Sequence, residues 1–263
     1  MKLTVLVDNS TYINEYYFGE PALSFYIENE NDKILFDLGY SDVFAKNAKL
    51  MKIDINSINK IVFSHGHNDH TGGLKYIKKR TDIIAHPDTF KTRKDDEGKY
   101  GSFMREEEIL KKHNFISTSN MIELSTNLFY LGEIPALNSF ETREEMGKII
   151  KDNESPDFTL DDSALVYKGK DAIHIITGCS HSGICNIIEY AKNKFNTDKI
   201  GKVIGGFHLF DCNKQVDKTI EYFKQNKIEN LYPCHCTSFK VKAKINSEIP
   251  IQEVGVGMEL EII

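Results

Sequence analysis

The chain has 263 residues, of which 40% are hydrophobic and 27% are charged, and its formal net charge is −6. This length fits one large domain or two small ones, and this hydrophobic share can build a core without disulfide bonds. The negative charge argues against a broad basic surface for nucleic acid. No run approaches the roughly 18 apolar residues of a membrane span, so we expect neither a nucleic-acid partner nor a membrane.

The cysteines and the N-terminus indicate a cytoplasmic location. The apolar run Leu3–Val7 ends at Asp8 and is too short for a secretory signal. An odd number of cysteines, all in the last third of the chain, suits reduced thiols better than a disulfide framework. These cysteines are Cys179, Cys185, Cys212, Cys234 and Cys236.

In the first half of the chain, short apolar runs alternate with polar turns, a pattern typical of strands. A helix is expected at Ser41–Leu50, with Ser41 as its N-cap, and another at Gly72–Arg80. The polar stretch Asn29–Asp32 is expected to form a hairpin turn. Strands are expected at Leu3–Val7, Leu23–Glu28, Lys33–Asp37, Lys60–Ser64 and Asp82–His86.

The second half follows the same pattern. Helices are expected at His181–Lys194 and Lys214–Asn226. Strands are expected at Leu128–Leu131, Ala164–Lys168, Ala172–Thr177, Lys202–Gly206 and Asn230–Cys234. Two halves of strands and helices predict an α/β protein, a single domain over 1–263 folded as a four-layer αββα sandwich.

The stretch from Pro87 to Phe115 is rich in charge and departs from this pattern. One interpretation is a solvated loop with a helix. The other is a lid over a substrate, because long insertions in compact domains are often functional. If the segment (about 87–115) folds over a site, one or two of its basic residues could hold a phosphate: Lys91, Arg93, Lys94, Lys99 and Arg105.

The segment Ile61–Gly73 carries the strongest chemical signal. It places His65, His67, Asp69 and His70 within six residues, directly after an apolar strand. Imidazole and carboxylate are ligands of zinc and iron, and side chains this close would repel or desolvate one another without a cation. His65 and His67 alternate as on an extended chain and can point to one side, whereas Asp69 and His70 begin a turn. The pattern therefore predicts two metal ions sharing one loop.

This segment resembles the His-x-His-x-Asp-His signature of the metallo-β-lactamase superfamily. Ile34–Gly39 resembles the strand of that superfamily that ends in a buried Asp behind the ligands, here Asp37. Four further pieces resemble one subfamily, named for 7,8-dihydropterin-6-methyl-4-(β-D-ribofuranosyl)aminobenzene-5′-phosphate synthase. These pieces are Leu6–Asn9, Thr177–Gly183, Gly205–Leu209 and Pro233–Thr237.

The resemblance implies a ligand set for two divalent metal ions, with zinc expected and iron or manganese as alternatives. It assigns His65 and His67 to the first metal. It assigns Asp69 and His70 to the second metal, and His235 matches the last histidine of the superfamily and completes that second position.

The remaining ligands are less clear from the motif. The superfamily supplies a further histidine to the first metal and an aspartate that bridges both metals. Thr177-Gly-Cys179 stands where the pattern reads Thr-Gly-Asp, so either Cys179 supplies a thiolate or His181 enters as the missing histidine. We favour His181, because a small buried thiol is a common alternative for Cys179. His208 is either a substrate or proton-relay histidine or a polar residue satisfied at a turn.

These residues predict a metal-dependent hydrolase or transferase that acts on a small phosphorylated or pyrophosphorylated metabolite. Two cations lower the pKa of a shared water and stabilise an oxyanion. Asp69 is expected to orient that water, and His208 is the second catalytic candidate. The subfamily resemblance implies instead the condensation of a pterin pyrophosphate with an aminobenzene ribotide.

Other functions of this fold remain as alternatives. A non-catalytic metal-binding or sensing protein would carry the same ligands, and a nuclease would need a basic face that the net charge disfavours. A di-iron oxygen-reducing enzyme would be expected to have a carboxylate where His67 stands. An antibiotic lactamase is disfavoured by the absence of a secretion signal.

Overall fold

The computed structural model describes residues 1–98 and 100–263. Its largest sheet has seven strands in the order β16-β1-β2-β3-β4-β5-β7. The pairs from β16 to β3 are antiparallel, and those from β3 to β7 are parallel. The strands are β1 (Lys2–Val7), β2 (Ser24–Asn29), β3 (Asp32–Phe36), β4 (Lys60–Val62), β5 (Asp82–Ala85), β7 (Asn114–Ser117) and β16 (Glu259–Glu261).

The second large sheet has six strands in the order β15-β14-β13-β12-β9-β8. Strands β13, β14 and β15 run parallel, and the others pair antiparallel. Parallel pairing buries both faces of a strand, and residues 173–177, 203–206 and 231–234 of these three strands are buried throughout. The strands are β8 (Ile122–Ser125), β9 (Leu128–Tyr130), β12 (Ala164–Lys168), β13 (Ile173–Thr177), β14 (Ile200–Gly206) and β15 (Asn230–Cys234).

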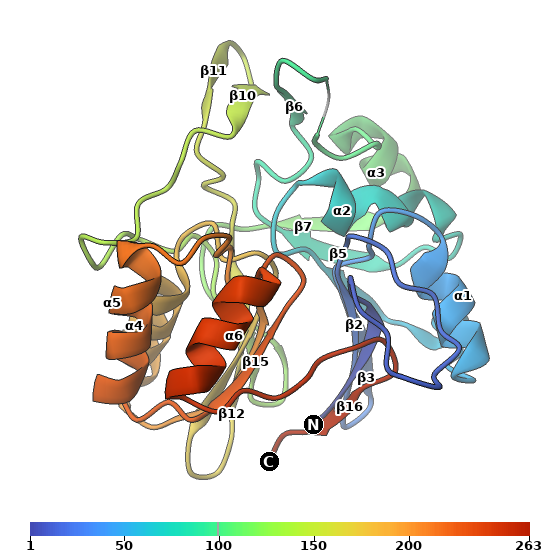
Figure 1. Ribbon diagram of the computed structural model, residues 1–263. Coiled ribbons are helices and arrows are strands. Elements are labelled where there is room, and N and C mark those ends of the chain that lie inside the picture. Colours follow the sequence, from blue (N-terminus) through green and yellow to red (C-terminus); the bar gives the residue numbers. More distant parts are fainter. Residues whose placement is uncertain (99) are drawn as a thin grey trace.

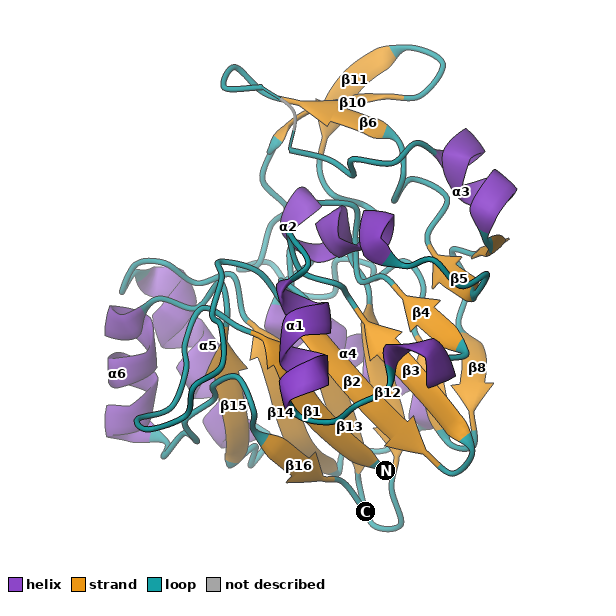
Figure 2. Ribbon diagram, turned by 90° about the vertical axis from the view of Figure 1, so that its right-hand side faces the viewer, coloured by secondary structure: helices purple, strands orange, loops and turns teal. Residues whose placement is uncertain are grey.

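Helices cover the outer faces of both sheets (Figures 1 and 2). One apolar cluster joins the six-stranded sheet to α4 (Ile184–Phe195), α5 (Lys214–Gln225) and α6 (Phe239–Glu248). A second cluster lies between the two sheets, and a third joins the seven-stranded sheet to α1 (Val43–Leu50) and α3 (Glu106–Lys112). The expected αββα order of layers is therefore confirmed. The chain also forms two short 3-10 turns, η1 (Ile55–Ser57) and η2 (Gly72–Tyr76), and one short helix, α2 (Asn68–Thr71).

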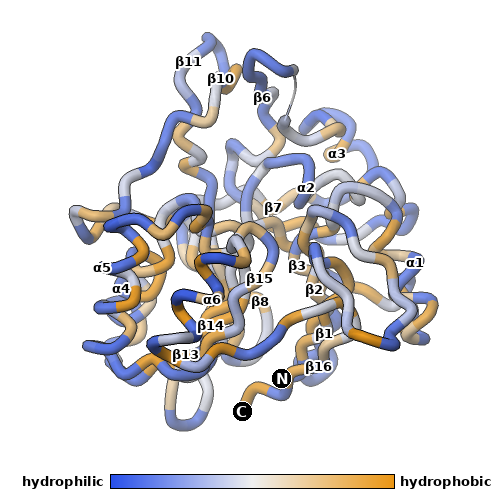
Figure 3. Tube along the Cα trace, in the orientation of Figure 1, coloured by the Kyte–Doolittle hydropathy of each residue, from blue (hydrophilic) through white to orange (hydrophobic). Residues whose placement is uncertain are grey.

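A three-stranded sheet, β11-β10-β6, rises above the sandwich at the top of Figure 1. It combines β6 (Thr92–Lys94), from the charged segment, with β10 (Gly147–Ile150) and β11 (Glu154–Asp157). Figure 3 shows that the β6 and β11 segments are hydrophilic. The charged segment thus pairs with chain more than 50 residues away, a contact that its sequence does not indicate.

Several element boundaries differ from the expectation. Helix α1 begins at Val43 with Asp42, not Ser41, at its N-cap position; the Ser41 hydroxyl donates to Glu20 Oε2 at 2.6 Å and accepts from Val43 N at 3.3 Å. The expected helix at Gly72–Arg80 is only a 3-10 turn, because Gly72 and Gly73 pack against the backbone of the Leu38–Tyr40 segment. Helix α4 begins at Ile184 rather than His181.

Helix α6 was not expected, although Ser238 is its N-cap and accepts from Val241 N. Within residues 1–98 and 100–263, no helix combines the length and apolar character needed to cross a membrane.

Candidate metal centre

The chemically distinctive side chains gather where strands of both large sheets end. In each sheet the parallel strands present their carboxyl ends at one edge, which is where open α/β sheets bind ligands. Asp37 follows β3, and the loop with His65 follows β4. From the second sheet, the loop after β13 carries Cys179 and His181, and His235 follows β15 directly.

Several residues at these strand ends have left-handed backbone conformations. Asp37, Ser180, His208 and His235 all have positive φ, at 57°, 61°, 50° and 48°. Non-glycine residues adopt this left-handed region at an energetic cost, and such residues cluster at functional sites. Four of them around one edge indicate that the fold holds this edge in a specific geometry.

The first group of candidate ligands consists of His65, His67 and His181, whose ligand atoms all lie within 4.8 Å of one another. Their ring centroids are 4.5 Å (His65–His67), 4.8 Å (His65–His181) and 4.7 Å (His67–His181) apart. Three imidazoles around one point are a typical ligand set of catalytic zinc.

The second group consists of Asp69, His70, Cys179 and His235. Asp69 Oδ2 lies 3.5 Å from His70 Nε2 and 3.3 Å from His235 Nε2, and His70 Nε2 lies 3.1 Å from Cys179 Sγ. The two groups adjoin, because the His65 and His70 rings are 4.2 Å apart. The structure therefore places Cys179 and His181 in different groups, so the two do not compete for one position.

The unpartnered ring nitrogens provide the test of whether a metal fits. Nε2 of His65, His67, His181 and His235 is buried in each case, with no hydrogen-bond partner among the described residues. Buried polar atoms are normally satisfied, and four orphaned nitrogens facing two small clusters are best explained by cations. Imidazole, carboxylate and thiol donors together suit zinc.

In His65, His70 and His235 the opposite ring nitrogen, Nδ1, lies next to a partner that directs Nε2 inward. Asp37 Oδ2 lies 2.7 Å from His70 Nδ1, and Asp37 also accepts from the Ser64 amide (2.8 Å) and hydroxyl (2.7 Å). The Ser64 hydroxyl lies 2.9 Å from His65 Nδ1. Such partners fix the tautomer and orientation of ligating histidines.

His235 is held from the N-terminal strand. Its Nδ1 lies 3.0 Å from Asn9 Oδ1, and its amide donates to Asp8 Oδ1 at 2.8 Å. Asp8 and Asn9 belong to the Leu6–Asn9 stretch that resembles the subfamily. The sequence alone did not indicate that Asp8 contacts a residue 227 positions away.

A buried ion-pair network supports the loop between His65 and His67. The Gly66 amide donates to Asp161 Oδ2 at 2.7 Å, and Asp161 Oδ1 accepts from Arg93 Nη2 at 2.6 Å. Arg93 Nε donates to Asp157 Oδ2 at 2.8 Å. The Arg93 side chain is fully buried. This network connects the three-stranded sheet to the metal loop, and sequence reasoning missed it because its members are distant in the chain.

The expectation that basic residues of the charged segment hold a phosphate therefore fails for Arg93, whose guanidinium is occupied by two carboxylates. Lys91 pairs with Glu106 and Lys94 with Glu154, both at 2.6 Å. Lys99 lies outside the described residues. Arg105 is exposed at the N-cap position of α3, and its part in the expectation stays a prediction.

Burial is the main cause of the shifted pKa values at the centre. Burial, reinforced by neighbouring histidines, lowers the pKa of His65 and His181 well below the usual value. Burial and Arg93 lower the pKa of His67 to about 3. Neutral imidazoles keep the lone pair that a metal requires.

The second group contains the acidic donors. Burial would raise the pKa of Asp69, but His70 and His235 outweigh it and hold the pKa below its usual range. Burial raises the pKa of the Cys179 thiol, and the adjacent Cys236 adds to this rise. A cation next to Cys179 would favour its thiolate.

His208 lies beside the ligands without belonging to either group in the described chain. Its ring centroid is 4.2 Å from that of His181. Burial, with a smaller effect from His235, lowers its pKa to about 4. His208 is thus a neutral imidazole at the edge of the centre.

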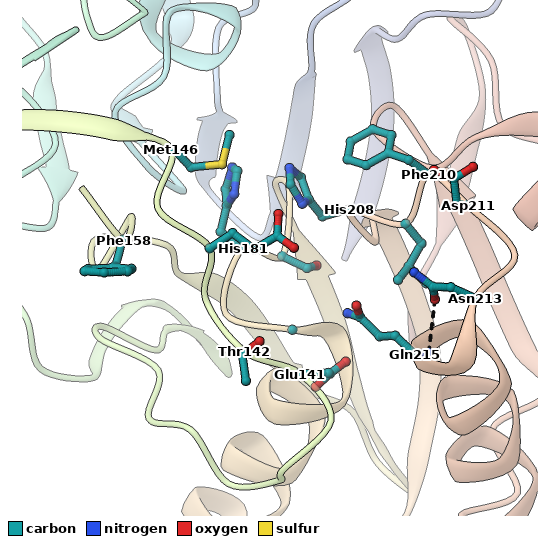
Figure 4. Close-up of a pocket in the computed structure, with 14 residues that line it drawn as sticks. Glu141, Thr142, Met146, Phe158, His181, His208, Phe210, Asp211, Asn213 and Gln215 are labelled. Atoms are coloured by element: carbon teal, nitrogen blue, oxygen red, sulfur yellow. Dashed lines mark hydrogen bonds between the residues drawn. The ribbon is translucent and has the colours of Figure 1, made fainter. Parts of the chain in front are cut away.

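Cavities open over the candidate ligands. One of about 590 Å³ is lined by residues of both groups, including His67, Asp69 and His235. A narrower one of about 230 Å³ also has His181 and His208 in its lining. Figure 4 shows the rings of Phe158 and Phe210 on either side of this second cavity, with Met146 beside His181. The ligands are therefore reachable by a small molecule.

The comparisons with known proteins agree with this geometry. A model of the metallo-beta-lactamase superfamily matches residues 17–195. The chain therefore belongs to the metallo-β-lactamase superfamily, whose members generally bind divalent metals.

Two relatives come from Methanocaldococcus jannaschii. An uncharacterised protein is 32% identical over 255 residues, covering 93% of each chain. A protein named 7,8-dihydropterin-6-methyl-4-(beta-D-ribofuranosyl)-aminobenzene-5′-phosphate synthase is 30% identical over 269 residues, covering 92% of this chain and 89% of its own. The crystal structure of Tm1679, described as a metal-dependent hydrolase of the beta-lactamase superfamily, has a TM-score of 0.86 at 29% identity, covering 100% of this chain and 99% of that one.

Proposed function

We propose that this protein is a metal-dependent hydrolase or transferase that acts on a small phosphorylated or pyrophosphorylated metabolite through a dinuclear centre. The observation that carries the proposal is the pair of adjoining ligand groups at the floor of an open cavity. His65, His67 and His181 would hold one divalent ion. Asp69, His70, Cys179 and His235 would hold the other.

Divalent ions bound there would supply Lewis-acid activation of water and of a phosphoryl oxygen. The residues of the chain would do the rest. Asp69 is the one carboxylate among the two ligand groups, and its 29% exposed side chain can orient a nucleophile on the cavity side. His208 lines both cavities and, as a neutral imidazole, would accept the proton of the attacking water and pass it to the leaving oxygen.

The shape of the site supports a small substrate over a polymer. Five of the seven candidate ligands, all except His65 and His70, line a cavity of about 590 Å³, within the usual size of small-molecule sites. The net charge of −6 provides no general attraction for a polyanion. Affinity for the substrate would therefore come from local contacts around the centre.

A condensation reaction is the second candidate, and the relative named as a synthase favours it. Both reactions would use the same centre and differ in whether water or an amine attacks. The cavity between Phe158 and Phe210 offers room for an aromatic group beside the centre. In the condensation, this cavity would hold the ring of the second reactant.

The test begins with elemental analysis of protein purified without added metal, where we expect about two divalent ions per chain. The same preparation is then assayed on phosphomonoesters, diphosphates, a pterin pyrophosphate with an aminobenzene ribotide, RNA and DNA, with His65→Ala as the inactive control. Turnover of a small substrate supports the proposal. Cleavage of RNA or DNA alone would make the protein a nuclease, and bound metal without any turnover would favour a sensing protein.

A further inference from the structure

Charge is distributed unevenly around the candidate metal centre. Among the described residues that line the cavity of about 590 Å³, Lys242 is the only lysine or arginine. Two neighbouring openings carry acidic side chains and no lysine or arginine: Glu144 and Asp211 line the narrower cavity, and Asp95 lines the opening near Tyr100. An anionic substrate group is therefore favoured on one side of the centre only, the side formed by α6.

Lys242 differs from the other lysines of the same helix. Lys240 pairs with Asp211, and Lys244 pairs with Asp217. Lys242 is half-buried and has no ion-pair partner within residues 1–98 and 100–263. A partly buried ammonium without a carboxylate partner is available to an incoming anion.

The surroundings of Lys242 also suit an anion. Helix α6 begins at the same cavity, with Ser238 as its N-cap, and helix N-termini carry a partial positive charge. Thr237 and Ser238 also line the cavity, and in the sequence they lie between His235 and Lys242. His235, a candidate ligand of the second group, lines the same cavity, so an anion held by Lys242 would lie beside that group.

We propose that Lys242 and the first turn of α6 form an anion subsite that binds a phosphate group of the substrate next to the metal centre. The inference rests on the proposed function and adds the orientation of the substrate. The phosphate or diphosphate end faces α6, and the uncharged or cationic remainder faces Phe158 and the acidic side chains. Lysine serves such a subsite as a point charge that tolerates several phosphate geometries.

The experiment uses inorganic pyrophosphate as the probe and full-length, metal-loaded protein. Binding is measured by calorimetry for the unmodified protein and for Lys242→Met, Lys242→Arg and Lys244→Met. Lys244→Met is the matched control, because it removes a charge from the same helix outside the cavity. Metal content and thermal unfolding are recorded for every variant, so that a lost metal or a damaged fold is recognised.

We expect Lys242→Met to weaken pyrophosphate binding about tenfold, the usual effect of losing one charge-assisted contact. Lys242→Arg should retain most of the affinity, and Lys244→Met should bind as the unmodified protein does. The loss in Lys242→Met should shrink as salt rises, because salt screens the interaction. Metal content should be equal in all four proteins.

Equal affinity in Lys242→Met and the unmodified protein, at equal metal content, would overturn the inference, as would an equal loss in Lys244→Met. The anion subsite and the proposed function can fail independently in these experiments. Binding that depends on Lys242 without turnover of any phosphorylated substrate would leave the anion subsite standing and refute the catalytic proposal. Turnover that does not depend on Lys242 would refute the anion subsite and leave the catalytic proposal standing.

Discussion

Replacing Gly66 with alanine should disable the metal centre through backbone geometry alone. A Cβ at this position would overlap Thr89 O and Arg93 Nη1 and would lie 2.8 Å from Thr89 C. Real Cβ atoms essentially never approach closer than 3.0 Å. The obstacle includes backbone and a buried guanidinium held by Asp157 and Asp161, so neither can move aside cheaply.

The size of the effect follows from that overlap. Inserting a methyl group into a packed site costs about 1–3 kcal/mol of unfolding free energy. For a chain of this size that corresponds to a fall in Tm of roughly 2–12 °C. The loop would also have to shift by about 1 Å, and because His65 and His67 flank Gly66, a shift of this size costs on the order of 100-fold in rate.

The assay combines thermal unfolding, metal content and turnover for Gly66→Ala and a matched control. Gly19→Ala is that control, since a Cβ at the exposed Gly19 would meet nothing closer than 3.4 Å. We expect the control to match the unmodified protein in all three measurements. If Gly66→Ala bound two metals with unchanged Tm and turnover, the close packing of the metal loop against Thr89 and Arg93 would be refuted.

Three further predictions concern the ligands. His65→Ala and His70→Ala should each lose one metal and nearly all activity while far-ultraviolet circular dichroism stays native; full metal content in either would contradict its assignment. His181→Ala should lose the metal of the first group, whereas Cys179→Ser should keep that metal and weaken only the second; elemental analysis would show the reverse if the groups were misassigned. Asp37→Asn should lower metal affinity about 10–100-fold, because its carboxylate orients His70; a chelator competition that detects no change would rule this role out.

The local part of the site was readable from the sequence. His65, His67, Asp69 and His70 lie within six residues, so their spacing along an extended chain and a turn predicts a shared metal site without knowledge of the fold. The apolar and polar runs likewise predicted the layered α/β architecture. A strand buried on one face has an alternating sequence, and a strand buried on both faces has a continuous apolar run. Each expected strand has a counterpart within a few residues, but the short strands β6, β7, β8, β10, β11 and β16 were not expected. Helix starts were displaced as well, because they depend on contacts such as that between Ser41 and Glu20.

Other features were decided only by the tertiary structure. The sequence left Cys179 and His181 as rivals, whereas the turn at Ser180, with its positive φ, sends them to different groups. The burial of Arg93 between two carboxylates follows from strand pairing more than 50 residues apart, and that pairing has no local signal. Short-range spacing specifies which side chains share a loop, but long-range packing decides which loops meet, because loop closure depends on the free energy of the whole chain rather than on any one segment.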